Sequence, residues 1–266
     1  MRPSEITFEP DGSPLWLRLR RLQFRVFHPF RFRCIREQCR KHRCIFVHIP
    51  KCAGSSVEVS LYGKAGGHRT LAGYHLVLDP EDFASFFKFT FVRNPWDRLV
   101  SAYCFLKNTE LKGNRNWARQ NLAAYDDFDA FVRGWVTPEN VRSYSHFRPQ
   151  HHFVRLGERR PAVDFIGYYE NLAADFAVLC EKLNNTAKLG VENHNPRRAR
   201  DYRSYYTDET RRIAAEVYAD DVELFGYSFD NPGPTHARGA DSTPPGQELF
   251  QNETACQRSD MRPPKE

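Results

Sequence analysis

The fold of this chain is decided by the stretch CIFVHIPKCAGSS, at residues 44–56. Its first six residues are mostly apolar, β-branched or aromatic and follow a run of charged residues, so they predict a buried strand over 44–49. Pro50 ends this strand because proline has no N–H group to donate to a sheet ladder. The residues that follow are typical of a tight turn, and we expect a helix over 56–62. The stretch therefore predicts a strand, a loop and a helix in succession.

The loop between this strand and this helix has the chemistry of an anion site. Gly54 permits a tight turn, and Ser55 and Ser56 are expected to cap the helix. A helix N-terminus presents N–H groups and a positive dipole end, to which Lys51 adds a full charge. Lys51 precedes Gly54, whereas the lysine of a Walker A loop follows the second glycine. This order disfavours an ATPase, a GTPase or a kinase, and an ordinary strand-turn-helix with a surface lysine stays the alternative.

A second stretch, FTFVRNPWDRLVSAY at residues 89–103, repeats the pattern. An apolar strand is expected over 88–92, and Pro95 stands where a helix can begin, since its missing N–H costs nothing at the first helical position. Apolar residues then recur at helical spacing over 96–105. Two such units predict an α/β fold with a central parallel sheet flanked by helices. Ligands of such sheets bind beyond the carboxyl ends of the strands.

Arg93 and Ser101 are the residues of the second stretch that suit a phosphate. Arg93 ends the strand, where its guanidinium fork matches a phosphate monoester, and Ser101 supplies a hydroxyl two turns into the helix. In the alternative interpretation Arg93 pairs with Asp97, and Ser101 is a small packing residue. Because Lys51 and Arg93 both stand at the ends of strands, we expect them to form two halves of one pocket.

Length and composition agree with one α/β domain between two extensions. The chain has 266 residues and a net charge of +6, which suits an anionic ligand. We assign residues 1–40 to a basic N-terminal extension, 41–230 to the domain, and 231–266, rich in Pro, Gly, Ser and Thr, to a disordered tail. Further helices are expected over 128–136, 172–183 and 208–224.

Both stretches resemble motifs of a known family. Residues 49–56 match I-P-K-x-x-G-[ST]-[ST], and residues 91–103 match F-V-R-N-P-x-x-R-x-x-S-x-Y. These are motifs of the sulfotransferases that use 3′-phosphoadenosine 5′-phosphosulfate (PAPS), in particular of the carbohydrate branch, family 2, with its Golgi-type and bacterial members. The resemblance covers about residues 43–230. Within it, 163–172 is similar to the family's later strand and helix, and 202–209 with 225–227 to its C-terminal signature. It implies a P-loop-like, three-layer domain.

The resemblance also implies which residues bind PAPS. In the family the first motif holds the 5′-phosphosulfate, and the second holds the 3′-phosphate through its arginine and serine. The corresponding residues here are Lys51, Cys52, Ala53, Gly54, Ser55, Ser56, Arg93 and Ser101. By analogy with phosphoryl transfer the transition state is loose and in line, so Lys51 is expected to stabilise the leaving phosphate. No metal is expected, because the cysteines at 34, 39 and 44 lack a matching Cys/His pair at zinc spacing.

The acceptor hydroxyl needs a general base, for which His68 is our candidate. Histidine has a pKa suited to proton transfer near neutrality. His68 follows two glycines between the cofactor segments, and several family members, among them the heparan 2-O-sulfotransferase type, place a catalytic histidine in this interval. The alternatives are His75, then His48 and His194, and the acids Asp79 and Glu81.

A carbohydrate, including an anionic one, is the acceptor that the resemblance implies. The stretch SYSHFRPQHHFV, at residues 143–154, occupies the interval where family members bind acceptor. We predict acceptor contacts from Arg148, Gln150 and His151, with an exposed polar loop as the alternative. The basic run at 196–200 either contacts the 3′-phosphate or an acidic glycan, or is a solvated face.

The remaining partners are predicted from what the chain contains. No nucleic-acid motif accompanies the positive charge. No apolar run is long enough for a membrane span, although the basic and aromatic residues of 1–40 allow a peripheral membrane contact. Golgi relatives carry an N-terminal anchor, so we expect a cytoplasmic enzyme, with a Golgi-associated one as the alternative. Two other functions stay open: sulfation of a phenol, lipid or tyrosine, and binding of adenosine bisphosphate without turnover.

Overall fold

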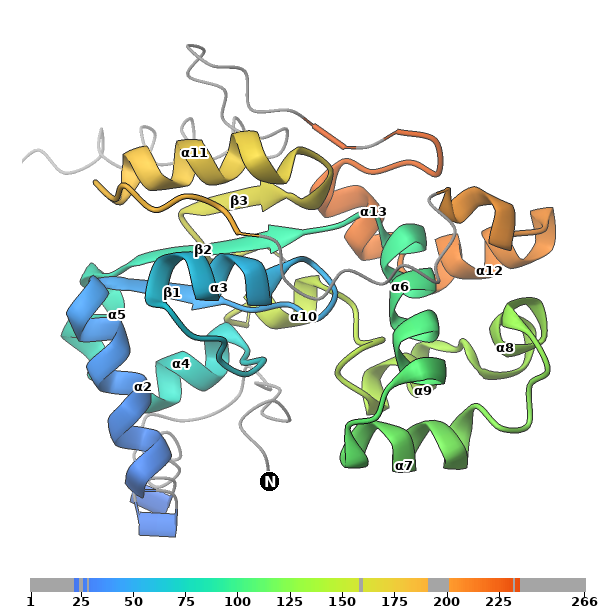
Figure 1. The fold of residues 1–266 in the computed structure, drawn as a ribbon, viewed down its shortest axis with the longest axis horizontal. Coiled ribbons are helices and arrows are strands. Elements are labelled where there is room, and N and C mark those ends of the chain that lie inside the picture. The colour runs from blue at the N-terminus through green and yellow to red at the C-terminus, as the bar shows by residue number, and fades with distance from the viewer. Residues whose placement is uncertain are drawn as a thin grey trace, which may run out of the picture.

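A parallel sheet of three strands, in the order β1-β2-β3, lies at the centre of the protein (Figure 1). The strands are β1 (Cys44–Val47), β2 (Phe87–Val92) and β3 (Phe165–Tyr168). Cys44 pairs with Phe87 and Phe89 pairs with Phe165, so β2 is the middle strand. The computed structural model describes residues 22–23, 26–27, 29–157, 160–190, 201–231 and 233–234.

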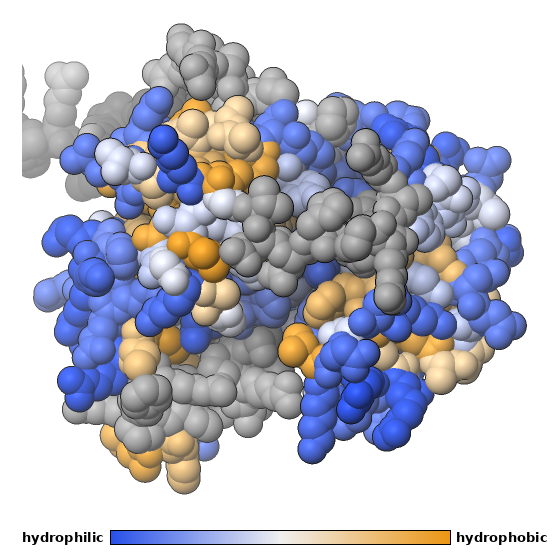
Figure 2. Space-filling view, in the orientation of Figure 1, coloured by the Kyte–Doolittle hydropathy of each residue, from blue (hydrophilic) through white to orange (hydrophobic). Residues whose placement is uncertain are grey.

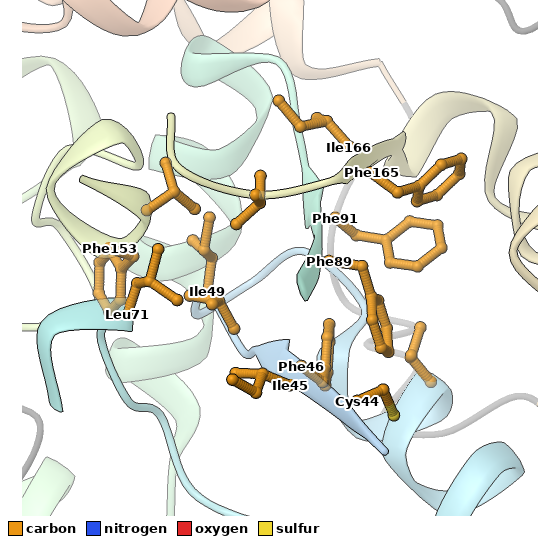
Figure 3. Packing of buried hydrophobic residues seen from close by; sticks show 14 of the residues in the cluster. Cys44, Ile45, Phe46, Ile49, Leu71, Phe89, Phe91, Phe153, Phe165 and Ile166 are labelled. Carbon is orange, nitrogen blue, oxygen red and sulfur yellow. The ribbon is translucent and has the colours of Figure 1, made fainter. Parts of the chain in front are cut away.

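Helices flank this sheet, which confirms the expected α/β fold (Figure 1). They are α2 (Pro29–His42), α3 (Gly54–Tyr62), α4 (Leu71–Val77), α5 (Pro80–Ser85), α10 (His151–Val154) and α11 (Leu172–Lys182). The strands are mostly apolar because helices cover both faces of a parallel sheet, and the buried Thr90 of β2 satisfies its hydroxyl by donating to the carbonyl oxygen of Val47 at 2.8 Å. Aromatic rings fill the core beside them, with Phe46 stacked on Phe89 at 5.0 Å between centroids (Figure 3).

Helix α2 crosses the boundary that composition places at residue 40. Ile35 and Cys39 are each 5% exposed and belong to the core around the sheet. Arg40 pairs with Asp79 at 2.8 Å and with Asp82 at 2.6 Å, which ties α2 to the start of α5. The core therefore includes residues that composition assigns to a basic extension.

A second group of helices packs beside the sheet through α6 (Pro95–Asn108), which begins where β2 ends (Figure 1). The others are α7 (Lys112–Asn121), α8 (Phe128–Trp135), α9 (Pro138–Ser143), α12 (Asp208–Val217) and α13 (Ala219–Phe225), with 3-10 turns at Tyr169–Asn171 (η2) and Tyr202–Tyr205 (η3). Trp96, Phe131 and Phe147 are buried in a core of their own. Helix α7 buries no residue, and its surface is hydrophilic (Figure 2).

One expected helix is divided in two. The sequence predicts a single helix over 208–224, whereas α12 ends at Val217 and α13 begins at Ala219. Tyr218 between them is buried, and its hydroxyl donates to the carbonyl oxygen of Phe147 at 2.7 Å. The break lets α13 pack against α10, where its Asp221 contributes to the site.

Some expectations concern the whole chain. Within the part that the structure describes, no helix is long and apolar enough to cross a membrane. The six cysteines in that part are free thiols, and no group of three or more His, Cys, Asp or Glu side chains there is placed to hold a metal ion. His194, the basic run 196–200, the tail beyond residue 234 and residues 1–21 lie outside the described residues.

Candidate active site

The candidate site lies where β1 and β2 end and α3 and α6 begin. After β1 the chain turns with a left-handed backbone at Lys51 (φ 71°) and Ala53 (φ 59°). Ala53 directly precedes α3 and its side chain makes no cap, so the expectation that Ser55 and Ser56 cap this helix is wrong. Both serines lie in the first turn, whose N–H groups have no partner within the helix.

Gly54 allows the loop to pack closely on His48. A Cβ atom at residue 54 would lie 2.0 Å from Cδ2 and 2.2 Å from Nε2 of the His48 ring. This ring is buried and is held on its other edge, since its Nδ1 contacts Glu58 Oε2 at 2.9 Å. The glycine of the motif is therefore required here by packing against a histidine.

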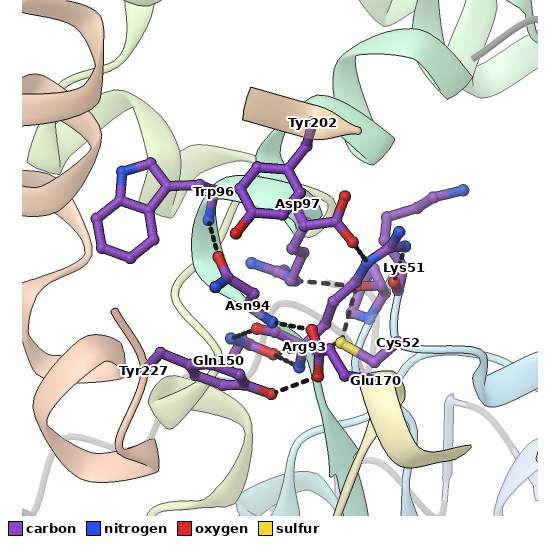
Figure 4. Close-up of polar contacts among 12 residues, drawn as sticks. Lys51, Cys52, Arg93, Asn94, Trp96, Asp97, Gln150, Glu170, Tyr202 and Tyr227 are labelled. Atoms are coloured by element: carbon purple, nitrogen blue, oxygen red, sulfur yellow. Dashed lines mark hydrogen bonds and ion pairs between the residues drawn. The ribbon is translucent and has the colours of Figure 1, made fainter. Parts of the chain in front are cut away.

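Arg93 joins the two predicted cofactor segments (Figure 4). Its Nη1 donates to the carbonyl oxygen of Lys51 at 2.9 Å, and its Nε donates to Asp97 Oδ2 at 2.7 Å. The guanidinium carbon lies 3.7 Å from the ring centroid of Tyr169. Burial lowers the pKa of Arg93, which the nearby Tyr169 and Glu170 oppose in part. The pairing with Asp97 considered as the alternative is present, and it coexists with the contact to the loop.

Gln150 holds the backbone of both segments. Its Nε2 donates to the carbonyl oxygen of Arg93 at 2.8 Å, and its Oε1 accepts from the Arg93 N–H at 2.9 Å. The same Oε1 accepts from the thiol of Cys52 at 3.3 Å. Burial raises the pKa of that thiol to about 12, so Cys52 is a neutral donor. Gln150 is completely buried, and these contacts differ from the acceptor role expected of it.

His151 and Arg148, the other residues expected at the acceptor, are also buried. The ring Nδ1 and the backbone N–H of His151 contact Asp221 Oδ1 at 2.7 and 2.9 Å, and Asp221 Oδ2 accepts from the Gln150 N–H at 2.7 Å. Burial by itself would raise the pKa of Asp221, but these hydrogen bonds and His151 hold it below its usual value. Arg148 donates through Nε and Nη2 to the carbonyl oxygen of Arg142 at 3.3 and 3.2 Å. Arg148, Gln150 and His151 are thus buried and bonded to other groups of the protein, so they hold the segment before and at the start of α10 in place.

Arg98 is a residue of the site that sequence reasoning did not single out. It is 2% exposed, and its Nε donates to the carbonyl oxygen of Pro50 at 3.0 Å. Its Nη2 donates to the carbonyl oxygens of His146 at 3.3 Å and Arg148 at 2.9 Å. Arg98 therefore ties the start of the lysine loop to the segment before α10. The available signal was the second arginine of the 91–103 motif.

The side chain of Lys51 extends over α6. Its Nζ lies 4.0 Å from the ring centroid of Phe105, a cation–π contact. Ser101 precedes Phe105 by one turn, and Asp97, the partner of Arg93, precedes Ser101 by another. One side of α6 thus gathers Lys51, Ser101 and Arg93, three of the residues predicted to bind the cofactor.

His68 belongs to a cluster of three imidazoles. Its ring centroid is 4.4 Å from that of His48 and 5.6 Å from that of His146, edge to face in both cases. His146 in turn stacks on Phe105 and on Tyr144, each at 5.3 Å. Because Phe105 is also the ring beneath the Lys51 ammonium, the imidazole cluster adjoins the lysine. The Nδ1 atoms of His68 and His146 are buried and have no hydrogen-bond partner.

These two imidazoles are held in the neutral form. Burial lowers the pKa of His68 well below its usual value, with further lowering by His48 and His146, while a hydrogen bond to the backbone of His48 opposes the shift. The pKa of His146 falls to about 3, first through burial and then through Lys51 and Arg98. A neutral imidazole with an unpartnered nitrogen is the form in which a general base accepts a proton, and the lowered pKa makes each of these two imidazoles a weaker base than free histidine.

The alternative bases have other surroundings. His75 lies on α4 with its ring 4.8 Å from that of Phe83. Asp79 pairs with two arginines of α2, and Glu81 is exposed on α5. His48 follows β1 instead of lying within it, and it is part of the imidazole cluster.

The last described segment of the chain closes onto the end of β2. Asn94 Nδ2 donates to the carbonyl oxygens of Ser228 at 2.9 Å and Asn231 at 3.2 Å. The Asn94 N–H donates to Glu170 Oε1 at 2.7 Å, and Glu170 Oε2 accepts from the Tyr227 hydroxyl at 3.0 Å (Figure 4). Burial raises the pKa of Glu170, although these bonds and Arg93 oppose it. The stretch that contains Tyr227 is thus bonded directly to the second cofactor segment.

A sequence model of the sulfotransferase family matches residues 38–228 of this chain. The match is 191 of the 266 residues and includes both strand–loop–helix segments, the imidazole cluster and Tyr227. The chain therefore belongs to the sulfotransferase family, which confirms the resemblance found in its two motifs.

Curated proteins similar to this chain include two named sulfotransferases. Carbohydrate sulfotransferase 14 of Danio rerio is 24% identical over 238 residues, which cover 74% of this chain and 63% of that protein. The Homo sapiens protein of the same name is 27% identical over 165 residues, 51% of this chain and 43% of the relative. An uncharacterized protein of Archaeoglobus fulgidus is 30% identical over 110 residues, 41% of this chain and 77% of the relative. This chain thus spans less than two thirds of each named relative, and no solved structure matches it.

Proposed function

We propose that this sulfotransferase transfers a sulfuryl group from PAPS to a hydroxyl of a carbohydrate. The observation that carries the proposal is the 2.9 Å hydrogen bond from Arg93 Nη1 to the Lys51 carbonyl oxygen. It brings two cations from neighbouring parallel strands to the same edge of the sheet, where ligands of such sheets bind. PAPS has anionic groups at two places, the 5′-phosphosulfate and the 3′-phosphate, and these two cations suit them.

The residues at this edge fit such a donor. On one side, the first turn of α3 offers N–H groups without helical partners, together with the hydroxyls of Ser55 and Ser56. Lys51 stands beside them, so we assign this side to the 5′-phosphosulfate. On the other side, the guanidinium of Arg93 and the half-buried Ser101 suit the 3′-phosphate.

PAPS, when bound, supplies the sulfuryl group and a phosphate that leaves as the S–O bond breaks. Lys51 Nζ would neutralise the charge that grows on the leaving oxygen, and Phe105 helps to orient this ammonium. Neutral His68 would accept the proton of the acceptor hydroxyl at its unpartnered Nδ1 while the acceptor oxygen bonds to sulfur. The products would be a sulfate ester of the acceptor, adenosine 3′,5′-bisphosphate as the leaving group, and a protonated His68.

A carbohydrate acceptor is supported by the names of the two vertebrate relatives, both of which are carbohydrate sulfotransferases. Because Gln150 is completely buried, we do not assign it an acceptor contact. We place the acceptor hydroxyl beside His68 instead.

Calorimetric titration with adenosine 3′,5′-bisphosphate (PAP) tests the cofactor. PAP should bind, and 5′-AMP and ATP should bind more weakly. Arg93→Lys keeps a charge but loses the fork, and should weaken PAP binding about 10- to 100-fold, since a hydrogen bond to a charged group is worth roughly 1.5–3 kcal/mol. Arg119→Ala, at an exposed position on α7, is the control and should leave PAP affinity unchanged. A protein that prefers ATP, or does not bind PAP, contradicts the proposal.

Transfer of labelled sulfate from PAPS to a panel of polysaccharides, phenols and peptides tests the reaction. We expect label on a polysaccharide, and Lys51→Ala should reduce kcat far more than it reduces PAP affinity. Label only on a phenol, lipid or tyrosine would overturn the carbohydrate assignment while leaving the donor assignment intact.

A further inference from the structure

Glu58 is a buried carboxylate that the proposed reaction does not use. It lies in the second turn of α3 and is 2% exposed. Its Oε2 contacts His48 Nδ1 at 2.9 Å and accepts from the backbone N–H of Gly66 at 2.6 Å. A buried charge needs such partners, because leaving it without them is costly. Both partners adjoin His68, which stands two residues after Gly66.

The contact with Gly66 is close, and a side chain at residue 66 would displace the carboxylate of Glu58. A Cβ atom at residue 66 would lie 2.5 Å from Glu58 Oε1. Gly66 itself is exposed, and it lies in a stretch without regular structure between α3 and α4. A hydrogen bond to a carboxylate is stronger than one between neutral groups. Glu58 therefore anchors an otherwise exposed stretch just before His68.

The contact with His48 fixes the other side of His68. Nδ1 of His48 lies 2.9 Å from Glu58 Oε2, and this contact sets the orientation of the ring. The His48 ring then faces the His68 ring edge to face at 4.4 Å, and the backbone of His48 makes a hydrogen bond with His68. Two separate routes, through Gly66 and through His48, thus lead from one carboxylate to the same imidazole.

We propose that Glu58 is the positioning residue of the general base, fixing His68 relative to the helix that holds the donor. This inference rests on the proposed role of His68. Since α3 begins at Gly54, beside Lys51, and carries Glu58 one turn later, the donor loop and the base share one rigid support. Transfer between two bound reactants depends steeply on such placement, and a misplacement of about 1 Å can cost roughly 100-fold in rate.

The groups that face His68 have different parts in this arrangement. His48 comes from the residues after β1, Lys51 from the loop, and His146 from the segment before α10; all three lower the pKa of His68. Of these three, His48 is the one in contact with Glu58. Removal of Glu58 would therefore alter the position of His68.

Amide exchange tests the anchor without any activity measurement. In the wild-type protein the Gly66 amide should exchange slowly for an exposed residue, because the Glu58 bond protects it. Glu58→Ala should speed this exchange at least about tenfold, and Glu58→Gln, whose amide oxygen can still accept, should speed it less. Equal exchange of Gly66 in the wild-type and Glu58→Ala proteins would overturn the inference, even if the protein proves not to be a PAPS enzyme.

A double-mutant cycle on kcat tests the positioning. Glu58→Ala should lower kcat about 10- to 100-fold with PAP affinity within about twofold of wild type, which also shows that the donor loop is folded. In a His68→Asn background, Glu58→Ala should change kcat less than about twofold, because the group it positions is gone. The exposed Glu216→Ala on α12 is the control and should have no effect in either background.

The outcomes separate this inference from the proposed function. Equal loss of kcat on Glu58→Ala in both backgrounds means a general structural role and overturns the inference. Unchanged kcat in His68→Asn alone overturns the base assignment, and the positioning claim with it, while PAP binding and the other tests of the donor site stand.

Discussion

Gly54→Ala is expected to destabilise the protein, although alanine is normally the better residue in a helix. The added Cβ would lie 2.0 Å from Cδ2 of the His48 ring, about 1.4 Å short of the 3.4 Å at which ordinary contact begins. This ring has little room to withdraw. Glu58 holds its Nδ1 at 2.9 Å, and Phe46 and His68 pack against it at 5.7 and 4.4 Å between centroids.

The magnitude follows from the two ways of relieving the clash. Forcing extra volume into a packed core costs about 1–3 kcal/mol. Moving the His48 ring instead weakens a hydrogen bond to a buried carboxylate, worth roughly 1.5–3 kcal/mol. The helix gains less than about 1 kcal/mol in return. We therefore expect a net loss of about 2 kcal/mol, or a fall in Tm of roughly 4–8 °C for a protein of this size.

Thermal and urea unfolding measure this change, and Gly113→Ala is the matched control. Gly113 lies in α7, where a Cβ would meet nothing within 4 Å. The same substitution there should raise stability, by about 0.5 kcal/mol. If Gly54→Ala is as stable as wild type, or gains as much as Gly113→Ala, the packing of the loop on His48 is not as described.

Three further changes have expected outcomes. Arg98→Met leaves buried carbonyl oxygens without donors and should cost at least about 3 kcal/mol in urea unfolding. Asp221→Asn breaks the buried pair with His151 and should cost about 3 kcal/mol at pH 7. Because the pKa of Asp221 is lowered by folding, this difference should shrink as the pH falls below its usual value of 3.8. The pKa of His146 is lowered from 6.5 to about 3 in the folded protein. Between these values the unfolded chain carries a proton on His146 that the folded protein does not, so the free energy of unfolding should fall as the pH drops below 6.5. His146→Phe should flatten this fall by up to about 1.4 kcal/mol per pH unit, measured by unfolding between pH 7 and pH 4.

The parts of the site that sequence predicts are those carried by local patterns. Short apolar runs predict β1 and β2, and Pro95 predicts the start of the helix after β2. The meeting of Lys51 with Arg93 follows from a general property of parallel sheets, since both residues stand at carboxyl ends of strands. The resemblance to the sulfotransferase family then adds the expectation that PAPS is the donor.

The parts that it misses depend on partners distant in the chain. The sequence predicts Gln150 as an acceptor contact, whereas in the structure its side-chain amide bonds the backbone of Arg93, 57 positions away. Arg98 takes its role from carbonyl oxygens 48 and 50 positions distant. The break at Tyr218 arises because its hydroxyl bonds Phe147, which local helix propensity cannot anticipate. The roles of Gln150, Arg98 and Tyr218 are therefore set by tertiary hydrogen bonds more than by local propensity.

The hydrogen bonds from Asn94 to Ser228 and Asn231 have a consequence for folding of the chain during its synthesis on the ribosome. They join positions 134 and 137 apart in the sequence. The strands β1 and β2 can pair early in translation, but this closure has to wait until residue 231 has been made. Contacts of such long range slow folding. A nascent chain therefore contains its lysine loop and Arg93 well before the segment that completes their surroundings, so the proposed donor site should form only after residue 231 has been made.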